Sequence, residues 1–590
     1  MFVRRSCVAT LILPIFAAAL VAQQPEKDSN GARLREGYGG QAIKASALKE
    51  WLAYVASDEL QGRQVYTEGL GLAAAYIADH LKEWGVKPVG DGGSYFQTVK
   101  VAGIKTTSRS SVTVEVNGRS RTFVDGEGIT FPRNMGEKQT IASGDVVFAG
   151  YGLQIPAAKI DDYATLDPKG KVVIWAGSSG PKSVGPESRR LLVARSRLAV
   201  AKGAAAVIGP PVFGLVGGRG RGGQAPPAEG SRGTPEPAAG RGTSAQDVDF
   251  TTAQRYEDAR VTPSVTAQDD FFEFLFSGSE LQYSEIKELA TKREPLPTFT
   301  LKGVKLTVNV DADYTVVNTR LTRNVVGVVE GSDPKLRDTY VAFGAHYDHI
   351  GYQQTTPAAG RGGGTAPGGC TGQTRPTPRS DDIVNNGADD DGSGTVALMG
   401  LARAFALGPR PKRSLLFVWH TAEESGLQGS RYNADYPVVP IESIVATLNI
   451  DMVGRNRCDD PAESNKVYLV GSDRISTELH NLSEDANASL AKPLTLDYEL
   501  NDPADPESIY TRSDHYSYAL KGIPIIFYTT GLHRDYHYVT DEIDKIEFDK
   551  LAHITQLVYA TGARVANLNH APVRDNKGPR VGKGGGGKIE

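Results

Sequence analysis

The chain has 590 residues, of which 40% are hydrophobic and 23% charged, and its formal net charge is −4. This length exceeds the roughly 250–300 residues at which a single hydrophobic core stops growing, so we expect at least two lobes. The composition is typical of a globular protein, and the slightly negative charge argues against nucleic acid as the main partner.

The amino terminus has the pattern of an export signal. Arg4 and Arg5 precede an apolar run from Cys7 to Val21, and a polar stretch follows. The run is too short for a comfortable membrane span. We therefore expect residues 1–22 to be a signal peptide and the mature protein to be periplasmic or secreted, without stable membrane insertion.

Removal of the signal would leave two cysteines, Cys370 and Cys458. An oxidising compartment permits them to form a disulfide, and the sequence leaves open whether they do.

Residues 46–106 show helical periodicity. Leu48, Trp51 and Leu52 recur at helical spacing, and a second apolar stripe ends at Gly85. We expect these helices to pack against a sheet supplied by a later part of the chain.

Residues 107–301 contain short β-rich runs such as "SVTVEVNG" and "GKVVIWAG", with neither His nor Cys. We expect an inserted domain that covers or gates a site located elsewhere. Within it, residues 214–242 form a Gly/Pro-rich stretch that we interpret as a disordered surface loop. The Gly-rich tail, 571–590, is expected to be flexible.

From Val325 onward, apolar runs alternate with helical stretches, which predicts an α/β fold with a mostly parallel sheet. The run from Leu415 to Trp419 is apolar throughout, as in a strand buried on both faces. We assign residues 302–570 to the main part of this domain.

Potential metal ligands follow several of these strands. The carboxyl ends of parallel strands meet at one edge of a sheet, where α/β proteins bind ligands. The candidates are His346, Asp348 and His349 in "GAHYDHI"; Asp389, Asp390 and Asp391 in "NNGADDDGSG"; His420, Glu423 and Glu424 in "HTAEES"; Asp451 in "LNIDMVG"; and His533 and His537 in "GLHRDYHYVTDE".

Each motif alone has a structural explanation, such as a helix cap or a turn. Their shared position at strand ends favours a metal site instead. Imidazole with carboxylate suits a zinc-type divalent ion. At least two histidines and three carboxylates exceed one tetrahedral site and suit two metals that share a carboxylate.

These motifs resemble, in kind and order, those of the co-catalytic zinc aminopeptidases. That family includes bacterial secreted leucyl aminopeptidases and, more distantly, glutamate carboxypeptidase II and the transferrin receptor. The resemblance covers about residues 48–100 and 325–566, and the region between resembles the protease-associated domain inserted in many members.

The resemblance implies two zinc ions and a role for each residue. His346 and Asp451 would bind one zinc, Glu424 and His537 the other, and Asp390 would bridge them. Those ligands are expected to work with two further residues: Glu423 as general base, and Asp348 as the carboxylate that fixes the tautomer of His346.

Some assignments stay open at this point. Within "DDD" the choice of Asp390 over Asp389 depends on the alignment, and His533 is a rival for His537. Residues near the last ligand that could line a substrate site are Ser513, Asp514, His515 and Tyr528.

The resemblance implies an exopeptidase acting on peptides with a free amino terminus. Alternatives are a single-zinc glutaminyl cyclase-like enzyme, a carboxypeptidase or dipeptidase of the same fold, and a non-catalytic receptor-type relative. A complete ligand set together with Glu423 argues against a binding module, which gains nothing from burying so many charges.

Overall fold

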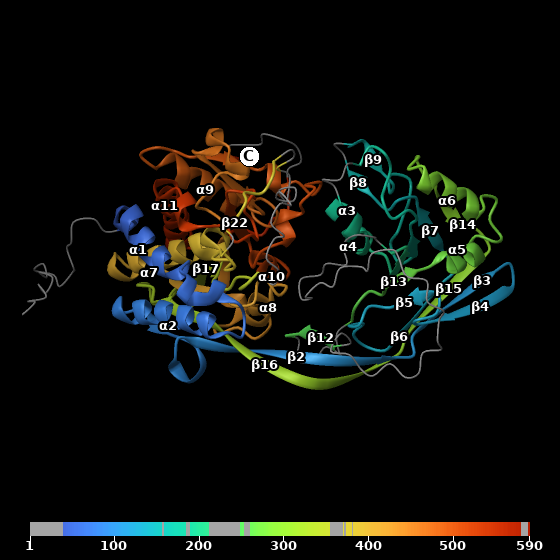
Figure 1. The fold of residues 1–590 in the computed structure, drawn as a ribbon, viewed down its shortest axis with the longest axis horizontal. Coiled ribbons are helices and arrows are strands. Elements are labelled where there is room, and N and C mark those ends of the chain that lie inside the picture. The colour runs from blue at the N-terminus through green and yellow to red at the C-terminus, as the bar shows by residue number, and fades with distance from the viewer. Residues whose placement is uncertain are drawn as a thin grey trace, which may run out of the picture.

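The computed structural model shows two lobes joined by a long two-stranded ribbon (Figure 1). We call them the larger lobe and the β-rich lobe. The residues that the structure describes are 39–155, 158–184, 189–211, 248–252, 260–353, 370, 373–379, 381–579 and 588–589. The predicted signal peptide 1–22, the loop 214–242 and residues 580–587 and 590 of the predicted tail lie outside them.

The larger lobe contains a mixed ten-stranded sheet. Its neighbouring strands β18, β17, β19 and β22 are parallel, and antiparallel strands flank them. In sheet order the strands are β12 (Val248–Thr251), β2 (Phe96–Ser108), β16 (Ala312–Val329), β18 (Ser414–His420), β17 (Tyr340–His346), β19 (Ile444–Ile450), β22 (Ile525–Thr529), β20 (Lys466–Val470) and β21 (Thr495–Asp497), with β1 (Lys87–Pro88) beside β16.

Helices cover both faces of this sheet. Five of them share one hydrophobic core with the sheet: α1 (Ala45–Val55), α2 (Glu68–Glu83), α7 (Gly394–Leu407), α9 (Thr477–Ala488) and α11 (Phe548–Asn567). On the other face lie α8 (Gln428–Asp435) and α10 (His515–Ala519). The α/β fold predicted from the sequence is confirmed.

Strand β18 shows why its sequence is apolar throughout. Leu415, Phe417 and Trp419 lie in the core under the five helices, whereas Leu416 and Val418 lie in the core under α8 and α10. A strand covered on both faces has no side that favours polar residues.

The β-rich lobe contains two main sheets around a separate hydrophobic core. The six-stranded sheet has the order β14 (Thr298–Leu301), β7 (Val146–Ala149), β10 (Val172–Ile174), β11 (Ala206–Gly209), β13 (Ser264–Ala267) and β5 (Ile129–Thr130). The four-stranded sheet has the order β4 (Arg119–Val124), β3 (Ser111–Val116), β15 (Val304–Val310) and β6 (Gln139–Ser143). The remaining elements are β8 (Gln154–Ile155), β9 (Ile160–Asp161), α3 (Arg189–Val193), α4 (Arg195–Ala201), α5 (Asp269–Leu275) and α6 (Tyr283–Thr291).

The predicted domain change between residues 301 and 302 falls inside the β-rich lobe. β15 follows that point and still pairs with β3 and β6. The chain leaves the lobe along β16, which pairs with β2 through Ala312–Val325 and reaches β18 only through Val325–Val329. Hydrophobic runs alone could not place this boundary, because β15 and β16 both have β-rich sequences.

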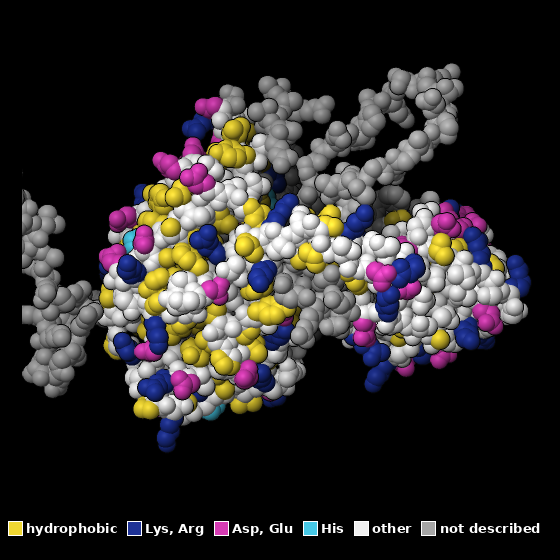
Figure 2. All heavy atoms as spheres, turned by 90° about the horizontal axis from the view of Figure 1, so that it is seen from below, with side chains coloured by type: hydrophobic (Ala, Val, Ile, Leu, Met, Phe, Trp, Pro, Cys, Tyr) yellow, Lys and Arg dark blue, Asp and Glu magenta, His cyan; other side chains and the backbone are white. Residues whose placement is uncertain are grey.

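The two lobes also touch away from the ribbon. Arg197 in α4 donates to the Thr511 hydroxyl over 3.2 Å. A cavity of about 430 Å³ is lined by residues of both lobes, including Leu191 and Tyr510. Seen from below, acidic and basic side chains are interspersed, and hydrophobic side chains gather mainly over the larger lobe (Figure 2). Among the described residues, no helix has the length and apolar character needed to cross a membrane.

Candidate metal centre

The site lies where the parallel strands of the larger lobe end. His346 closes β17 and pairs in register with His420 at the end of β18. Glu423 and Glu424 follow β18, and Asp451 follows β19. The fold therefore brings together residues that lie more than a hundred positions apart in the sequence.

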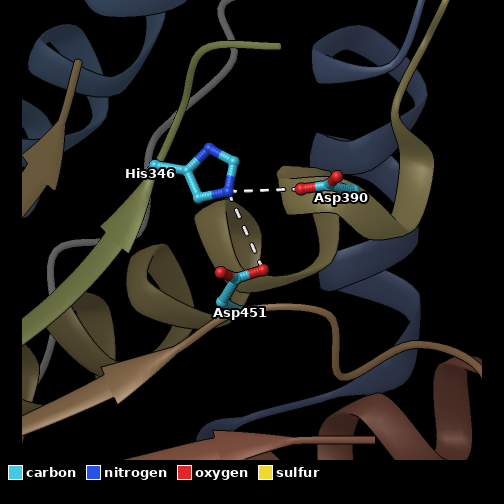
Figure 3. Close-up of side chains that lie close together, drawn as sticks. All are labelled: His346, Asp390 and Asp451. Carbon is cyan, nitrogen blue, oxygen red and sulfur yellow. Dashed lines mark ion pairs between the residues drawn. The ribbon is translucent and has the colours of Figure 1, made fainter. Parts of the chain in front are cut away.

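A first metal-type group contains His346, Asp390 and Asp451 (Figure 3). His346 Nε2 is 3.2 Å from Asp390 Oδ1 and 3.7 Å from Asp451 Oδ1. Burial opposes a charge on His346, but these carboxylates outweigh burial and raise its pKa well above the ordinary value. The carboxylates thus favour a cation at this position.

A second metal-type group contains His349, Asp390 and Glu424. His349 Nδ1 is 3.1 Å from Glu424 Oε1 and 3.9 Å from Asp390 Oδ2. His537 Nε2 approaches the same two oxygens, at 2.8 Å from Glu424 and 2.9 Å from Asp390. Asp390 therefore faces the first group with Oδ1 and the second with Oδ2.

The three consecutive aspartates have separate partners. Asp389 Oδ1 accepts the Gly454 N–H at 2.7 Å, and its Oδ2 is 3.4 Å from His533 Nε2. Asp391 accepts the backbone N–H groups of His346, Gly394 and Met452. Asp390 alone of the three belongs to the metal-type groups, and His533 lies beside Asp389 while His537 lies beside Asp390.

Asp348 lies beneath both groups, fully buried. Its carboxylate accepts the N–H of Glu423 at 3.1 Å and of Glu424 at 3.3 Å. His346 Nδ1 lies 3.1 Å from the Asp348 carbonyl oxygen and 3.7 Å from its carboxylate. The backbone carbonyl is thus the hydrogen-bond partner of His346, and the carboxylate holds the Glu423–Glu424 turn. Burial raises the pKa of Asp348 to about 7.

Glu423 is buried in the same charge cluster. Burial raises its pKa well above the ordinary value, His346 opposes this, and Glu424 and Asp514 add to it. A carboxyl group whose pKa is raised in this way is suited to accept and return a proton.

The four residues expected to line a substrate site divide into two pairs. Ser513 forms a hydrogen bond with the metal-type residue Asp451: burial raises the pKa of Asp451, and His346 and this hydrogen bond oppose the rise. Asp514 lies 3.3 Å from His420 Nδ1. Ser513 and Asp514 therefore adjoin the cluster. His515 instead contacts the Tyr510 carbonyl at 2.8 Å, and the Tyr528 hydroxyl contacts Ser483 at 3.1 Å, so both face the protein interior.

Two structural supports were not predicted from the sequence. Asp541 Oδ2 accepts the N–H groups of Asp389 and Asp390, at 3.1 and 3.2 Å. Arg63 is completely buried and donates to the carbonyls of Val55, Tyr347, Asn386 and Gly387. No local pattern marks either residue, since their partners lie far away in the sequence.

Cys370 and Cys458 form a disulfide, which settles the open question of their pairing. Gln373 donates to the Cys458 carbonyl at 2.9 Å, and Arg375 donates to the His537 carbonyl at 3.3 Å. The disulfide thereby fixes residues 373–379 beside the second metal-type group.

The donor set fits zinc. Imidazole nitrogens and carboxylate oxygens are common zinc ligands. Asp390 Oδ2 is buried with no hydrogen-bond partner among the described residues, as expected of an oxygen reserved for a cation. Fold and site together define an α/β protein with two adjoining metal-type groups at the carboxyl edge of its sheet.

Comparison with known proteins agrees with this class. Residues 324–562 match the model of Peptidase family M28. A probable leucine aminopeptidase of Arthroderma otae is 28% identical over 192 residues, covering 31% of this chain and 49% of the relative. Leupeptin-inactivating enzyme 1 of Streptomyces exfoliatus is 32% identical over 148 residues, covering 24% of this chain and 30% of the relative.

The chain spans about half the length, or less, of the curated relatives it matches. Among solved structures, an aminopeptidase from Aneurinibacillus sp. strain AM-1 aligns over 92% of this chain and 99% of its own, with 17% identity and a TM-score of 0.42. A Porphyromonas gingivalis glutaminyl cyclase covers 40% of this chain and 76% of its own, with 19% identity and a TM-score of 0.30.

Proposed function

We propose that the protein is an exported, zinc-dependent aminopeptidase that hydrolyses the amino-terminal peptide bond of peptides. The observation that carries this proposal is the position of Asp390, whose two oxygens face two separate groups of histidine and carboxylate. The match of residues 324–562 to the model of Peptidase family M28 and the similarity to relatives named leucine aminopeptidases support it.

In this proposal His346 and Asp451 would hold one zinc ion, Glu424 and His537 would hold the other, and Asp390 would contribute to both sites. When bound, the two ions supply an acidified water molecule and polarise the scissile carbonyl. Glu423 and Glu424 can have different roles although they are adjacent, because neighbouring side chains point in different directions. Glu424 would bind metal, and Glu423 would remain available for proton transfer.

Glu423 acts as the general base. It takes a proton from the attacking water and returns it to the leaving amine, and its raised pKa suits both steps. Asp348 positions it through the backbone, since one carboxylate accepts the N–H groups of both Glu423 and Glu424. The geometry of the base is therefore fixed from the segment that follows β17.

Charge favours a substrate with a free amino terminus. Five buried carboxylates surround the site, and two dications cancel only four negative charges; the five are Asp348, Asp390, Glu423, Glu424 and Asp451. The surplus attracts an α-ammonium group and repels a free carboxylate.

The β-rich lobe, in this proposal an inserted domain of the protease-associated type, narrows the approach to the site. Arg197 of that lobe contacts Thr511, two residues before Ser513 at the edge of the metal cluster. Folded proteins would be excluded, and short peptides or flexible chain ends would be accepted.

Export is supported by two features. Residues 1–22 have the pattern of a signal peptide, and Cys370 and Cys458 are paired, as oxidising compartments permit.

The test compares an aminoacyl reporter with its N-acetylated form. The purified protein should cleave the unblocked reporter, leave the acetylated one intact, lose activity to a chelator and regain it with zinc. Equal rates on both reporters would refute the aminopeptidase assignment while leaving a metallohydrolase. No cleavage of either, with zinc bound, would remove the hydrolase assignment as well.

A further inference from the structure

His349 is a buried histidine that the aminopeptidase motifs leave without a role. Its side chain is only 1% exposed, and neither ring nitrogen has a hydrogen-bond partner among the described residues. Leaving such a group unsatisfied in the protein interior is unfavourable. A buried polar group in this state calls for a partner of another kind, such as an ion.

The ring of His349 faces the same oxygens as His537. Nδ1 lies 3.1 Å from Glu424 Oε1, within reach of a hydrogen bond, yet the direction of a ring N–H there does not meet the carboxylate. Two imidazole nitrogens therefore approach Glu424 and Asp390, as they would if both were directed at one cation between them.

The surrounding backbone holds this ring in place. The His349 N–H donates to the Arg63 carbonyl at 3.1 Å. Gly387, with a φ of +54°, lies against the ring: a Cβ there would be 2.5 Å from His349 Cδ2. The ring fits because position 387 has no side chain, and glycine also suits the left-handed backbone.

We propose that His349 Nδ1 is a further ligand of the metal ion held by Glu424, His537 and Asp390. This inference rests on the proposed dizinc function. The rings of His349 and His537 have centres 5.6 Å apart, with an interplanar angle of 77°. Two imidazoles bound at about 2.0–2.1 Å to one tetrahedral zinc would have centres about 5 Å apart, so both can reach a shared ion.

The consequence is an unequal pair of metal sites. The site at His346 has one nitrogen and two carboxylates, whereas the site at His349 has two nitrogens and two carboxylates. Four protein ligands close a tetrahedral set, as in structural zinc sites, whereas three leave a position for water. The His349 site therefore fills first, and the His346 site offers the open position.

Zinc titration of the metal-free protein against a chromophoric chelator tests this. The wild-type chain should bind two equivalents, one tighter than the other. In His349→Asn the amide nitrogen takes the place of Nδ1 and can still donate a hydrogen bond, but it is a poor zinc ligand. We expect the affinity for the more tightly bound zinc ion to fall by at least about 100-fold. This is the upper end of the loss seen when a residue that only hydrogen-bonds to a metal ligand is removed.

The matched control is His480→Asn. His480 is fully buried too, but its Nδ1 contacts the Ser472 hydroxyl at 3.0 Å, and it should bind zinc as the wild type does. If His349→Asn keeps both zinc affinities, His349 is a hydrogen-bond donor or a packing residue and the inference is wrong.

X-ray absorption of the wild-type protein loaded with one equivalent of zinc needs no variant. Two imidazoles around that ion support the inference, and one imidazole overturns it. These outcomes are separable from failure of the proposed function, in which the wild-type chain would bind no zinc or only a single equivalent at saturation.

Discussion

Both lobes contain parallel strands whose carboxyl ends could hold a ligand, but among the described residues only the larger lobe carries unbalanced buried charge at those ends. In the β-rich lobe, the ends of β10, β11 and β13 line a cavity of about 910 Å³. Its acids have cationic partners near the surface: Asp269 lies 2.6 Å from Lys287, and Asp270 lies 3.0 Å from Arg121.

The larger lobe instead buries acids against histidines and against one another. Exposed ion pairs such as Asp269–Lys287 contribute little, whereas buried carboxylates beyond the number of cations are costly unless something binds them. The difference teaches that neither a strand end nor a hollow marks a site by itself. Buried charge that the protein does not balance is the stronger signal.

The largest expected effect comes from removing Glu423, the proposed general base. Glu423→Ala should lower turnover by roughly 10²–10⁴-fold while two zinc ions remain bound, because the general base is lost but the ligands are kept. Steady-state kinetics with elemental analysis of the same sample checks this. Near-normal turnover would show that another residue transfers the proton.

Asp390→Asn tests the shared ligand. We expect both zinc ions to bind more weakly, each by at least roughly 100-fold, since the neutral amide faces both groups where a carboxylate faced them before. A competition titration measures both constants. Weakening of only one equivalent would mean that Asp390 does not bridge.

The disulfide is confined to the larger lobe, because the β-rich lobe contains no cysteine. The double variant Cys370→Ser, Cys458→Ser should lose about 2–4 kcal/mol of unfolding free energy, since the bond closes a loop across a sequence separation of 88. Denaturant unfolding with probes in each lobe measures this loss.

Reduced wild-type protein is the control and should unfold like that double variant. If the β-rich lobe lost the same unfolding free energy as the larger lobe, the effect could not be assigned to the larger lobe alone.

Asp162 allows the cost of a buried acid to be tested in the β-rich lobe. Burial raises the pKa of this half-buried acid to about 6, and its Oδ2 accepts the N–H groups of Tyr151 and Leu153. Because the pKa is higher in the folded state than the ordinary 3.8, ionised Asp162 destabilises the fold increasingly as pH rises through this window, and fully above about 6.

Asp162→Asn keeps an oxygen for both N–H groups and removes the charge. Its stability gain over the wild type should therefore be larger at pH 7.5 than at pH 4.5, by about 1–2 kcal/mol. Unfolding curves at the two pH values decide this, and equal gains would exclude burial of charge as the cause.

The sequence predicts much of the larger lobe because its signals are local. The apolar run 415–419 was identified as a strand buried on both faces, and it is one. The placement of acids and histidines after strand ends also follows from the sequence, since strand ends are visible in it.

What the sequence could not predict depends on contacts between distant segments. Arg63 bonds Tyr347 across 284 positions, and Asp541 binds the Asp389 amide across 152. His349 and His537 occur in separate motifs, and only the fold shows that both face Glu424. The end of the β-rich lobe was misplaced because β15 and the ribbon strand β16 have similar sequences.

The bonds of Arg63 also bear on the order in which the chain folds. Its carbonyl partners at Asn386 and Gly387 lie 323 and 324 positions further along the chain. The strands of the two main sheets of the β-rich lobe, from β3 to β15, are made in between. A contiguous lobe can fold as it is synthesised, whereas contacts of such separation form slowly and late. We therefore expect the apolar faces of α1 and α2 to stay uncovered during synthesis until β17 and β18, which share their hydrophobic core, have been made. We also expect the larger lobe, which carries the candidate site, to be completed after the β-rich lobe has folded.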